Sequence, residues 1–219
     1  MQTNSLEEGV GAPDVIRHLV LLGDALENID IGVDAAEDAL VPRPRNPWKL
    51  TVLEPHKILE RGWSRVIPLD GTHIGICVEG GWAIEASGLL GGSAHTISGA
   101  LETLSEAADQ FEDIFTKLIA AALETGLPTV VCTLVPSRHG EPARRRAAAA
   151  ALAIFNDRVL RQAVAANLSV VDLRFVCDED SDFASETLLS LTGVRKVANV
   201  GRTALYEVSR ERGRTRVYF

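Results

Sequence analysis

Five short apolar runs, separated by helical patterns, constrain the fold of this sequence more than any other feature. They lie at residues 17–22, 49–53, 73–78, 129–134 and 169–173. Their apolar residues are continuous rather than alternating, which is typical of parallel strands covered by helices on both faces. We therefore expect an α/β protein with a five-stranded, doubly wound parallel sheet in one domain over residues 17–208.

Helical patterns connect the later runs. The clearest covers about 105–124, where the apolar residues share one stripe and Gly126 and Pro128 follow as stop signals. Further helices are predicted over about 142–166 and 191–208. In such a fold the functional crevice lies beyond the carboxyl ends of the strands, so the residues that follow each strand are the candidate site.

Charge and hydropathy exclude several classes of function. The chain has 219 residues and a formal net charge of −8, so it should repel nucleic acid and anionic membranes. No apolar run approaches the roughly 20 residues of a membrane span. The first residues lack the basic and apolar regions of a secretory signal. We expect a cytoplasmic protein in which residues 1–16 form a flexible segment.

The cysteines and the glycine pair give no sign of a cofactor. Cys77, Cys132 and Cys177 each lie in or beside an apolar run and form no C-x-x-C pair, which favours core packing. The Gly80-Gly81 pair lacks the spacing of a phosphate-binding loop. No metal, nucleotide or other cofactor is predicted.

The histidines do not form a metal-binding pattern either. No two of the five lie three or four residues apart on a predicted helix, and no zinc-type spacing occurs. His18 lies inside the first apolar run and His73 begins the third. We expect both to be packed or edge residues.

Several segments resemble the sequence blocks of the SGNH or GDSL-type esterase family. HLVLLGDALEN resembles the first block, which reads approximately GDS, and THIGICVEGGWAI resembles the third, an apolar strand that ends in GGND. LPTVVCTLV, FNDRVLRQAVAANLSVVDLRFVCDEDSDFAS and GVRKVA are similar to the later strands and helices of bacterial members. The similarity covers about 17–22 and 72–205 and implies a three-layer α/β/α sandwich with a five-stranded parallel sheet.

The resemblance also implies ester hydrolysis by a serine after the first strand, with an oxyanion hole that includes an asparagine of the third block. In this chain Asp24 is followed by Ala25, whose methyl group cannot form an acyl-enzyme. The asparagine aligns with Gly81 or, one register later, with Trp82. Neither side chain supplies the amide that an oxyanion hole needs.

The other two family positions are also degenerate. The glycine of the second block would fall at 54–56, where the chain reads Glu-Pro-His. The final block, which carries the histidine base in the family, would fall near 182–190, where Leu188 lies and no histidine follows His139. Because loss of a nucleophile or base costs about 10⁶ in turnover in a serine hydrolase, we predict a pseudoenzyme without the family activity.

Two alternatives remain open. A glycine-rich segment after the third strand carries hydroxyl and imidazole groups, at Ser87, Ser93 and His95, that could form a relocated site acting on a small-molecule ester. The vestigial crevice could instead hold a small ligand without catalysis. A loop without a site is the plainer interpretation of that segment.

A scaffold without catalytic groups indicates a binding role, in which the protein is a structural or regulatory subunit of a larger assembly with another protein. Trp82 is predicted to plug the old pocket or to anchor this partner. In the basic tail, 209–219, arginines recur at every second residue, which would place them about 6.6 Å apart along one face of a strand. The pattern suits strand addition or docking on an acidic surface, and a frayed end is the alternative. The candidate partner-binding residues are Trp82, Arg210, Arg212, Arg214, Arg216 and Phe219.

The acidic run 178–182 follows the last predicted strand. We interpret it as a solvated loop on the crevice side that could meet a basic partner.

Overall fold

The parallel sheet expected from the sequence is present. The computed structural model describes residues 17–23, 48–53, 57, 60–61, 66–78, 96–136, 138, 140–186, 188–211 and 215–219. Its strands are β1 (Arg17–Leu22), β2 (Trp48–Leu53), β3 (His73–Ile76), β4 (Thr129–Cys132), β5 (Ser169–Val171) and β6 (Val217–Tyr218). They are all parallel and follow the order β2-β1-β3-β4-β5-β6. The first five confirm the doubly wound arrangement.

The sixth strand corrects the sequence prediction. β6 pairs with β5, where the Val170 and Asp172 N–H groups donate to the carbonyls of Arg216 and Tyr218, each at 2.8 Å. The end of the basic tail does add as a strand, but it adds to the protein's own sheet. Because the last helix continues to Arg210, this arginine is helical, and the prediction of one extended arginine row is wrong there.

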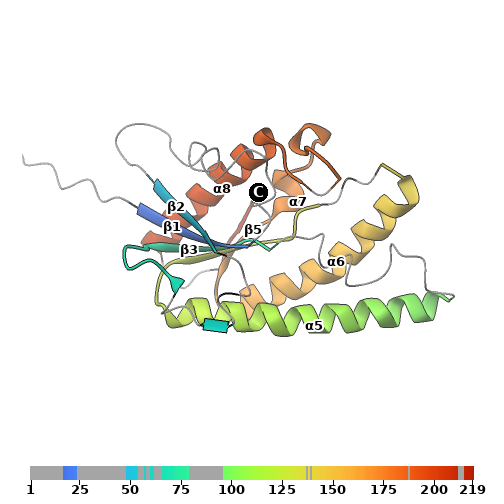
Figure 1. Cartoon of the computed structure of the whole chain (residues 1–219), viewed down its shortest axis with the longest axis horizontal. Helices are drawn as coiled ribbons and strands as arrows, with labels where there is room; N and C mark the ends of the chain where they lie inside the picture. Colours follow the sequence, from blue (N-terminus) through green and yellow to red (C-terminus); the bar gives the residue numbers. More distant parts are fainter. Residues whose placement is uncertain are drawn as a thin grey trace, which may run out of the picture.

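Helices cover both faces of the sheet and form the three-layer sandwich (Figure 1). α5 (Ile97–Glu124) and α6 (Pro142–Ala165) lie on one face, and α7 (Leu173–Val176) and α8 (Leu191–Arg210) lie on the other. A short 3₁₀ turn, η2 (Asp180–Asp182), connects α7 to α8. Phe111 of α5 packs edge-to-face on Phe155 of α6, with ring centroids 5.3 Å apart, which joins the two helices of the first layer.

α5 begins two turns before the predicted residue 105. Thr96 is its N-cap, and its side chain accepts the N–H of Gly99 at 3.0 Å. The prediction followed the apolar stripe, but Ile97 and Leu101 are exposed and the first buried residue is Leu104. The helix therefore starts where a cap is available rather than where burial begins.

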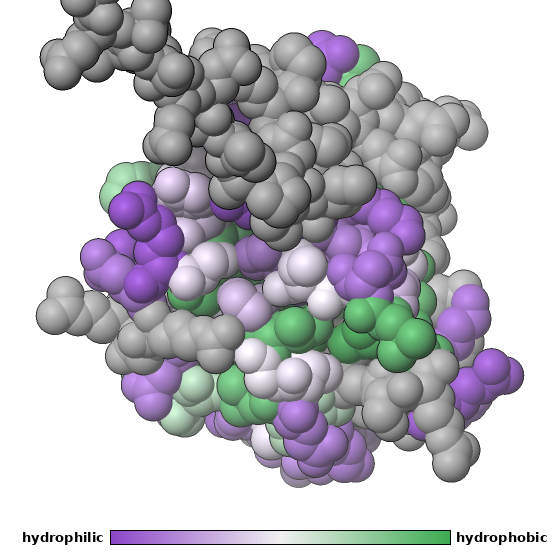
Figure 2. All heavy atoms as spheres, turned by 90° about the vertical axis from the view of Figure 1, so that its left-hand side faces the viewer, coloured by the Kyte–Doolittle hydropathy of each residue, from purple (hydrophilic) through white to green (hydrophobic). Residues whose placement is uncertain are grey.

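Two apolar clusters fill the spaces between the layers, one against α5 and α6 and one against α8. All three cysteines are free and buried, which confirms core packing. Within the described part of the chain, none of the helices combines the length and apolar character that a bilayer crossing needs. Figure 2 looks onto the N-terminal ends of the strands, where apolar residues form a band between polar ones.

Polar side chains join the N-terminal ends of the first strands. His18 Nε2 lies 2.8 Å from Thr51 Oγ1 of β2, and His18 Nδ1 lies 3.0 Å from Asp70 Oδ1. His73 Nε2 lies 2.7 Å from Ser209 Oγ of α8. Both histidines are buried, as expected for packed residues. They connect β1, β2 and β3 to the turn before β3 and to α8.

His73 makes stability depend on pH. Burial, together with the nearby charge of Arg17, lowers the pKa of His73 from 6.5 to about 4. Between these values the unfolded state binds more protons than the folded state, so stability falls as the pH decreases through this window. We expect the urea midpoint to fall more steeply from pH 7 to pH 4.5 in the wild type than in His73→Gln, which has no group that titrates there. Equal slopes in the two proteins would contradict this assignment.

Candidate functional site

In folds with this strand order the functional crevice is expected at the carboxyl ends of β1 and β3, where the strand order reverses. Gly23 follows β1 there with a φ of +144°, and its N–H donates to the Leu53 carbonyl at 3.1 Å. The Cys77 N–H donates to the Leu22 carbonyl at 2.7 Å. A Cβ on Gly23 would lie only 1.6 Å from the Cys77 carbonyl oxygen, so the switch point has no room for any other residue.

Most predicted site residues lie outside the described residues. These are Asp24, Ala25, Gly81 and Trp82, the alternative site at Ser87, Ser93 and His95, and the tail residues Arg212 and Arg214. Residues 54–56 and His139 also lie outside them. Leu188, Arg210, Arg216 and Phe219 are described. The side-chain contacts described below are therefore those at the carboxyl ends of β4 and β5 and at the start of α8.

Buried polar side chains that the sequence analysis missed fix the carboxyl ends of β4 and β5. Asn156 of α6 is fully buried, and its Oδ1 accepts the Leu134 N–H at 2.7 Å. Thr133 Oγ1 donates to Asp172 Oδ1 at 3.1 Å and accepts the Leu173 N–H at 2.8 Å. The sequence offered one sign of this network, because Asn156 is a polar residue on the otherwise apolar buried stripe of α6.

Arg174 neutralises the buried carboxylate of this network. Its Nε and Nη2 donate to Asp172 Oδ1 at 2.8 Å and Oδ2 at 2.5 Å. Burial opposes ionisation, but the Arg174 guanidinium and the Thr133 hydroxyl together lower the pKa of Asp172 below its usual value. The group therefore acts as a charged structural brace between β5 and α7.

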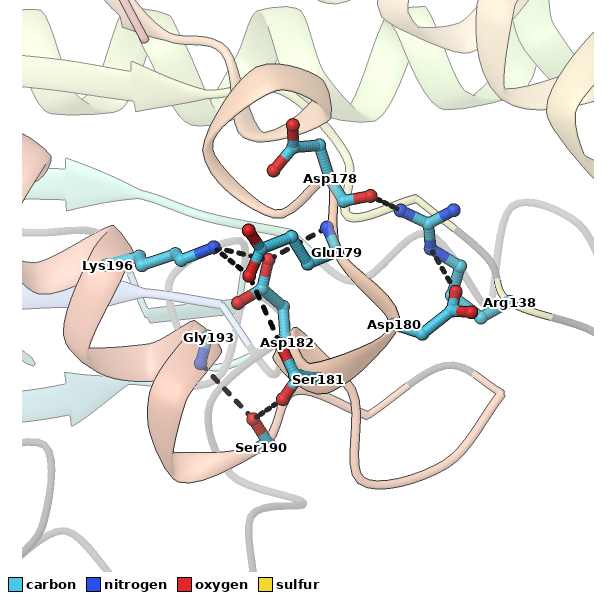
Figure 3. Close-up of polar contacts among 9 residues, drawn as sticks. All are labelled: Arg138, Asp178, Glu179, Asp180, Ser181, Asp182, Ser190, Gly193 and Lys196. Atoms are coloured by element: carbon cyan, nitrogen blue, oxygen red, sulfur yellow. Dashed lines mark hydrogen bonds and ion pairs between the residues drawn. The ribbon is translucent and has the colours of Figure 1, made fainter.

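An internal ion pair occupies the loop where the resemblance places the catalytic base (Figure 3). Lys196 Nζ of α8 lies 2.9 Å from Asp182 Oδ2 and 3.2 Å from Glu179 Oε2. The Glu179 N–H donates to Asp182 Oδ2 at 3.1 Å. Asp182 has no exposed surface, and its carboxylate raises the pKa of Lys196 above the usual value. The buried carboxylate of Asp182 thus pairs with a lysine and with a backbone N–H through Oδ2.

The rest of the loop packs closely on the first turn of α8. Ser190 Oγ donates to the Ser181 carbonyl at 2.6 Å and, as N-cap, accepts the Gly193 N–H at 3.3 Å. A Cβ on Gly193 would lie 2.3 Å from the Asp182 carbonyl oxygen. Leu188, predicted as a degenerate catalytic position, is half-buried, and its carbonyl accepts backbone N–H groups of the same loop.

The acidic run is only partly the solvated loop that was expected. The Arg138 guanidinium donates to the Asp178 carbonyl, and its Nε lies 3.8 Å from Asp180 Oδ1. Asp180 is 82% exposed, whereas Asp182 is fully buried. Among the residues that the structure describes, no group of three or more acidic, histidine or cysteine side chains is arranged to hold a metal ion.

Ion pairs within the chain hold the described part of the tail. Arg216 Nη1 donates to Glu207 Oε2 at 2.6 Å, and Nη2 donates to Glu211 Oε2 at 2.5 Å. The Tyr218 hydroxyl donates to the same Glu207 oxygen at 2.9 Å. These contacts lower the pKa of Glu207. Two of the candidate arginines thus have partners on α8. Arg216 forms an ion pair with Glu207, and Arg210 lies over the Tyr206 ring.

Phe219, another of the described partner candidates, is strongly exposed. It is 80% exposed and lies beside Phe175 of α7, which is 65% exposed, with ring centroids 6.2 Å apart. Val217 of β6 is also exposed. We call Phe175, Val217 and Phe219 the edge patch, because they lie in or beside β6, the outer strand of the sheet.

Comparison with known proteins finds relatives in structure alone. No protein-family model matches the sequence, and none of the curated proteins does. The extracellular lipase of Streptomyces rimosus matches with a TM-score of 0.60 at 12% identity, covering 86% of this chain and 99% of the lipase. A Desulfitobacterium hafniense protein described as lipolytic and of the G-D-S-L family matches with a TM-score of 0.59 at 12% identity, over 85% and 98% of the two chains. The lipase/acylhydrolase of Enterococcus faecalis matches with a TM-score of 0.57 at 15% identity, over 91% and 99%.

The protein therefore has the SGNH-hydrolase fold, as the sequence resemblance implied. Similarity at these identities establishes the architecture alone, because one fold can carry many functions.

Proposed function

We propose that this SGNH-fold protein is non-catalytic and acts by binding another protein, as a structural or regulatory subunit of a larger assembly. The observation that carries the proposal is the pairing of the buried Asp182 carboxylate in the loop before α8. Asp182 is fully buried against Lys196 and the Glu179 N–H, and no histidine occurs in residues 140–219. Asp182 in this state cannot serve as the general base, because such a base must reach the proton that it abstracts.

The sequence at the nucleophile position supports the same conclusion. Ala25 stands where the family resemblance places the serine, and its methyl group has no lone pair to attack an ester. Without nucleophile and base, only residual catalysis from binding would remain, about 10⁶-fold below an intact site.

The proposal expects no hydrolysis above buffer when the purified protein is given short-chain chromogenic esters, and no adduct by mass spectrometry after treatment with a fluorophosphonate. Ser87→Ala and Ser93→Ala variants serve as controls for the alternative site. Hydrolysis that these variants abolish would overturn the proposal and favour a relocated esterase site. A fluorophosphonate adduct at any residue would do the same.

The edge patch is the partner surface that the proposal favours. Aromatic side chains that are exposed in the free protein are enriched at interaction hot spots, and an outer strand can accept a further strand. We expect the double variant Phe175→Ala, Phe219→Ala to keep its stability within about 0.5 kcal/mol, because both rings are largely exposed. We expect the same variant to lose the partner that co-purifies with the wild type from its source, as measured by native mass spectrometry. A wild-type protein that stays monomeric with no bound protein would count against the assembly role.

A further inference from the structure

An apolar cavity lies between the sheet and α8. Its volume is about 60 Å³, and side chains of β1 to β5 and of α8 surround it. Every described residue that lines it is apolar, a glycine or a cysteine. These described residues therefore offer a ligand dispersion contacts, and none of their side chains is a strong hydrogen-bonding partner.

Small residues on both walls produce this cavity. On the sheet, a Cβ on Gly75 would lie 2.9 Å from Leu21 Cδ1, so a larger residue there would displace the end of that side chain. On the helix, Ala198 and Gly201 line the cavity opposite the sheet. A Cβ on Gly201 would meet no atom within 4 Å, so sterics do not require a glycine at this position.

The apolar side chains of the walls decide which kind of molecule can bind in the cavity. Water in a cavity needs two to four polar partners, whereas an apolar cavity stays dry and takes apolar molecules. An engineered cavity of about 150 Å³ holds benzene, so scaling from its six carbons gives about two or three carbon atoms for this one. The thiols of Cys77 and Cys132 line the wall and add polarizable contacts.

We propose that this cavity is a binding site for one small apolar molecule, of the size of xenon or a hydrocarbon of two or three carbons. The inference does not depend on the proposed partner-binding function, because the cavity lies under α8 and not at the edge patch.

Xenon titration of the wild-type protein tests the proposal, with the methyl NMR shifts of Leu19 and Val197 as the readout and nitrogen at the same pressure as the control. We expect saturable shifts of the cavity methyl groups and a thermal midpoint that rises with xenon pressure. Gly201→Leu should fill the space and weaken xenon binding at least tenfold, whereas Arg202→Ala, on the neighbouring residue, should bind as the wild type does. If Gly201→Leu does not fold, Gly201→Ala makes the same comparison with a smaller loss. The proposal is overturned if the wild-type shifts do not saturate, or if the filled variants respond as the wild type does.

Discussion

Replacing Gly23 with alanine should remove about 4 kcal/mol of folding stability, because overpacking costs about 1–3 kcal/mol and backbone strain costs a similar amount. Both effects act at this residue. Its φ of +144° suits glycine, and an added Cβ would lie 1.6 Å from the Cys77 carbonyl oxygen. To make room, β1 and β3 would have to separate where Cys77 N–H donates to the Leu22 carbonyl at 2.7 Å.

Urea denaturation of purified Gly23→Ala measures this loss, and Gly201→Ala is the matched control. Gly201 lies inside α8 with no atom within 4 Å of the added Cβ. Alanine is favoured over glycine in a helix by about 1 kcal/mol, so the control should be as stable as the wild type or more stable. Similar midpoints for Gly23→Ala and the wild type would show that the switch point can open, which contradicts the packing described here.

The second large effect is expected at Asp182. Asp182→Ala should cost about 3 kcal/mol, because it removes hydrogen bonds to a charged donor and to a backbone N–H and leaves space in a fully buried position. The Glu179 N–H, 3.1 Å from Oδ2, loses its acceptor, and Lys196 Nζ, 2.9 Å from Oδ2, loses the nearer of its two carboxylate partners. Asp182→Asn keeps the shape and an acceptor, so its loss should be smaller.

Asp180 provides the control for this prediction within the same acidic run. It is 82% exposed and lies 3.8 Å from Arg138, so Asp180→Ala should change stability by less than about 0.5 kcal/mol. Chemical denaturation of the three variants at pH 7 gives the comparison. Equal losses for Asp180→Ala and Asp182→Ala would mean that the buried ion pair does not hold the loop on α8.

The first five strands could be predicted because a strand between two apolar layers is mainly apolar. Their carboxyl ends could not be placed as well. The run 169–173 was predicted as one strand, but β5 ends at Val171 and Leu173 begins α7. Asp172 causes the change, because its side chain accepts the Arg174 N–H and caps a helical turn. An apolar run alone cannot show that the chain changes from strand to helix at Asp172.

β6 escaped prediction for a different reason. It has two residues, too few to form a periodic pattern, and it is held by backbone bonds to β5 and by the Arg216 and Tyr218 contacts with Glu207. The alternation of arginines in the tail did indicate an extended strand. It could not indicate that the strand would pair within its own sheet, because β5 lies far away in the sequence.

The amino-acid sequence by itself determined the parallel sheet, the burial of the three cysteines and the absence of a hydroxyl at residue 25, because each depends on local pattern or on residue identity. Only the tertiary structure decided that Asp182 is buried against Lys196, that the tail adds β6 at the edge of the sheet, and that a cavity remains under α8. These features arise where residues far apart in the chain meet. Their free energies depend on distances and on excluded water, which composition and periodicity do not specify.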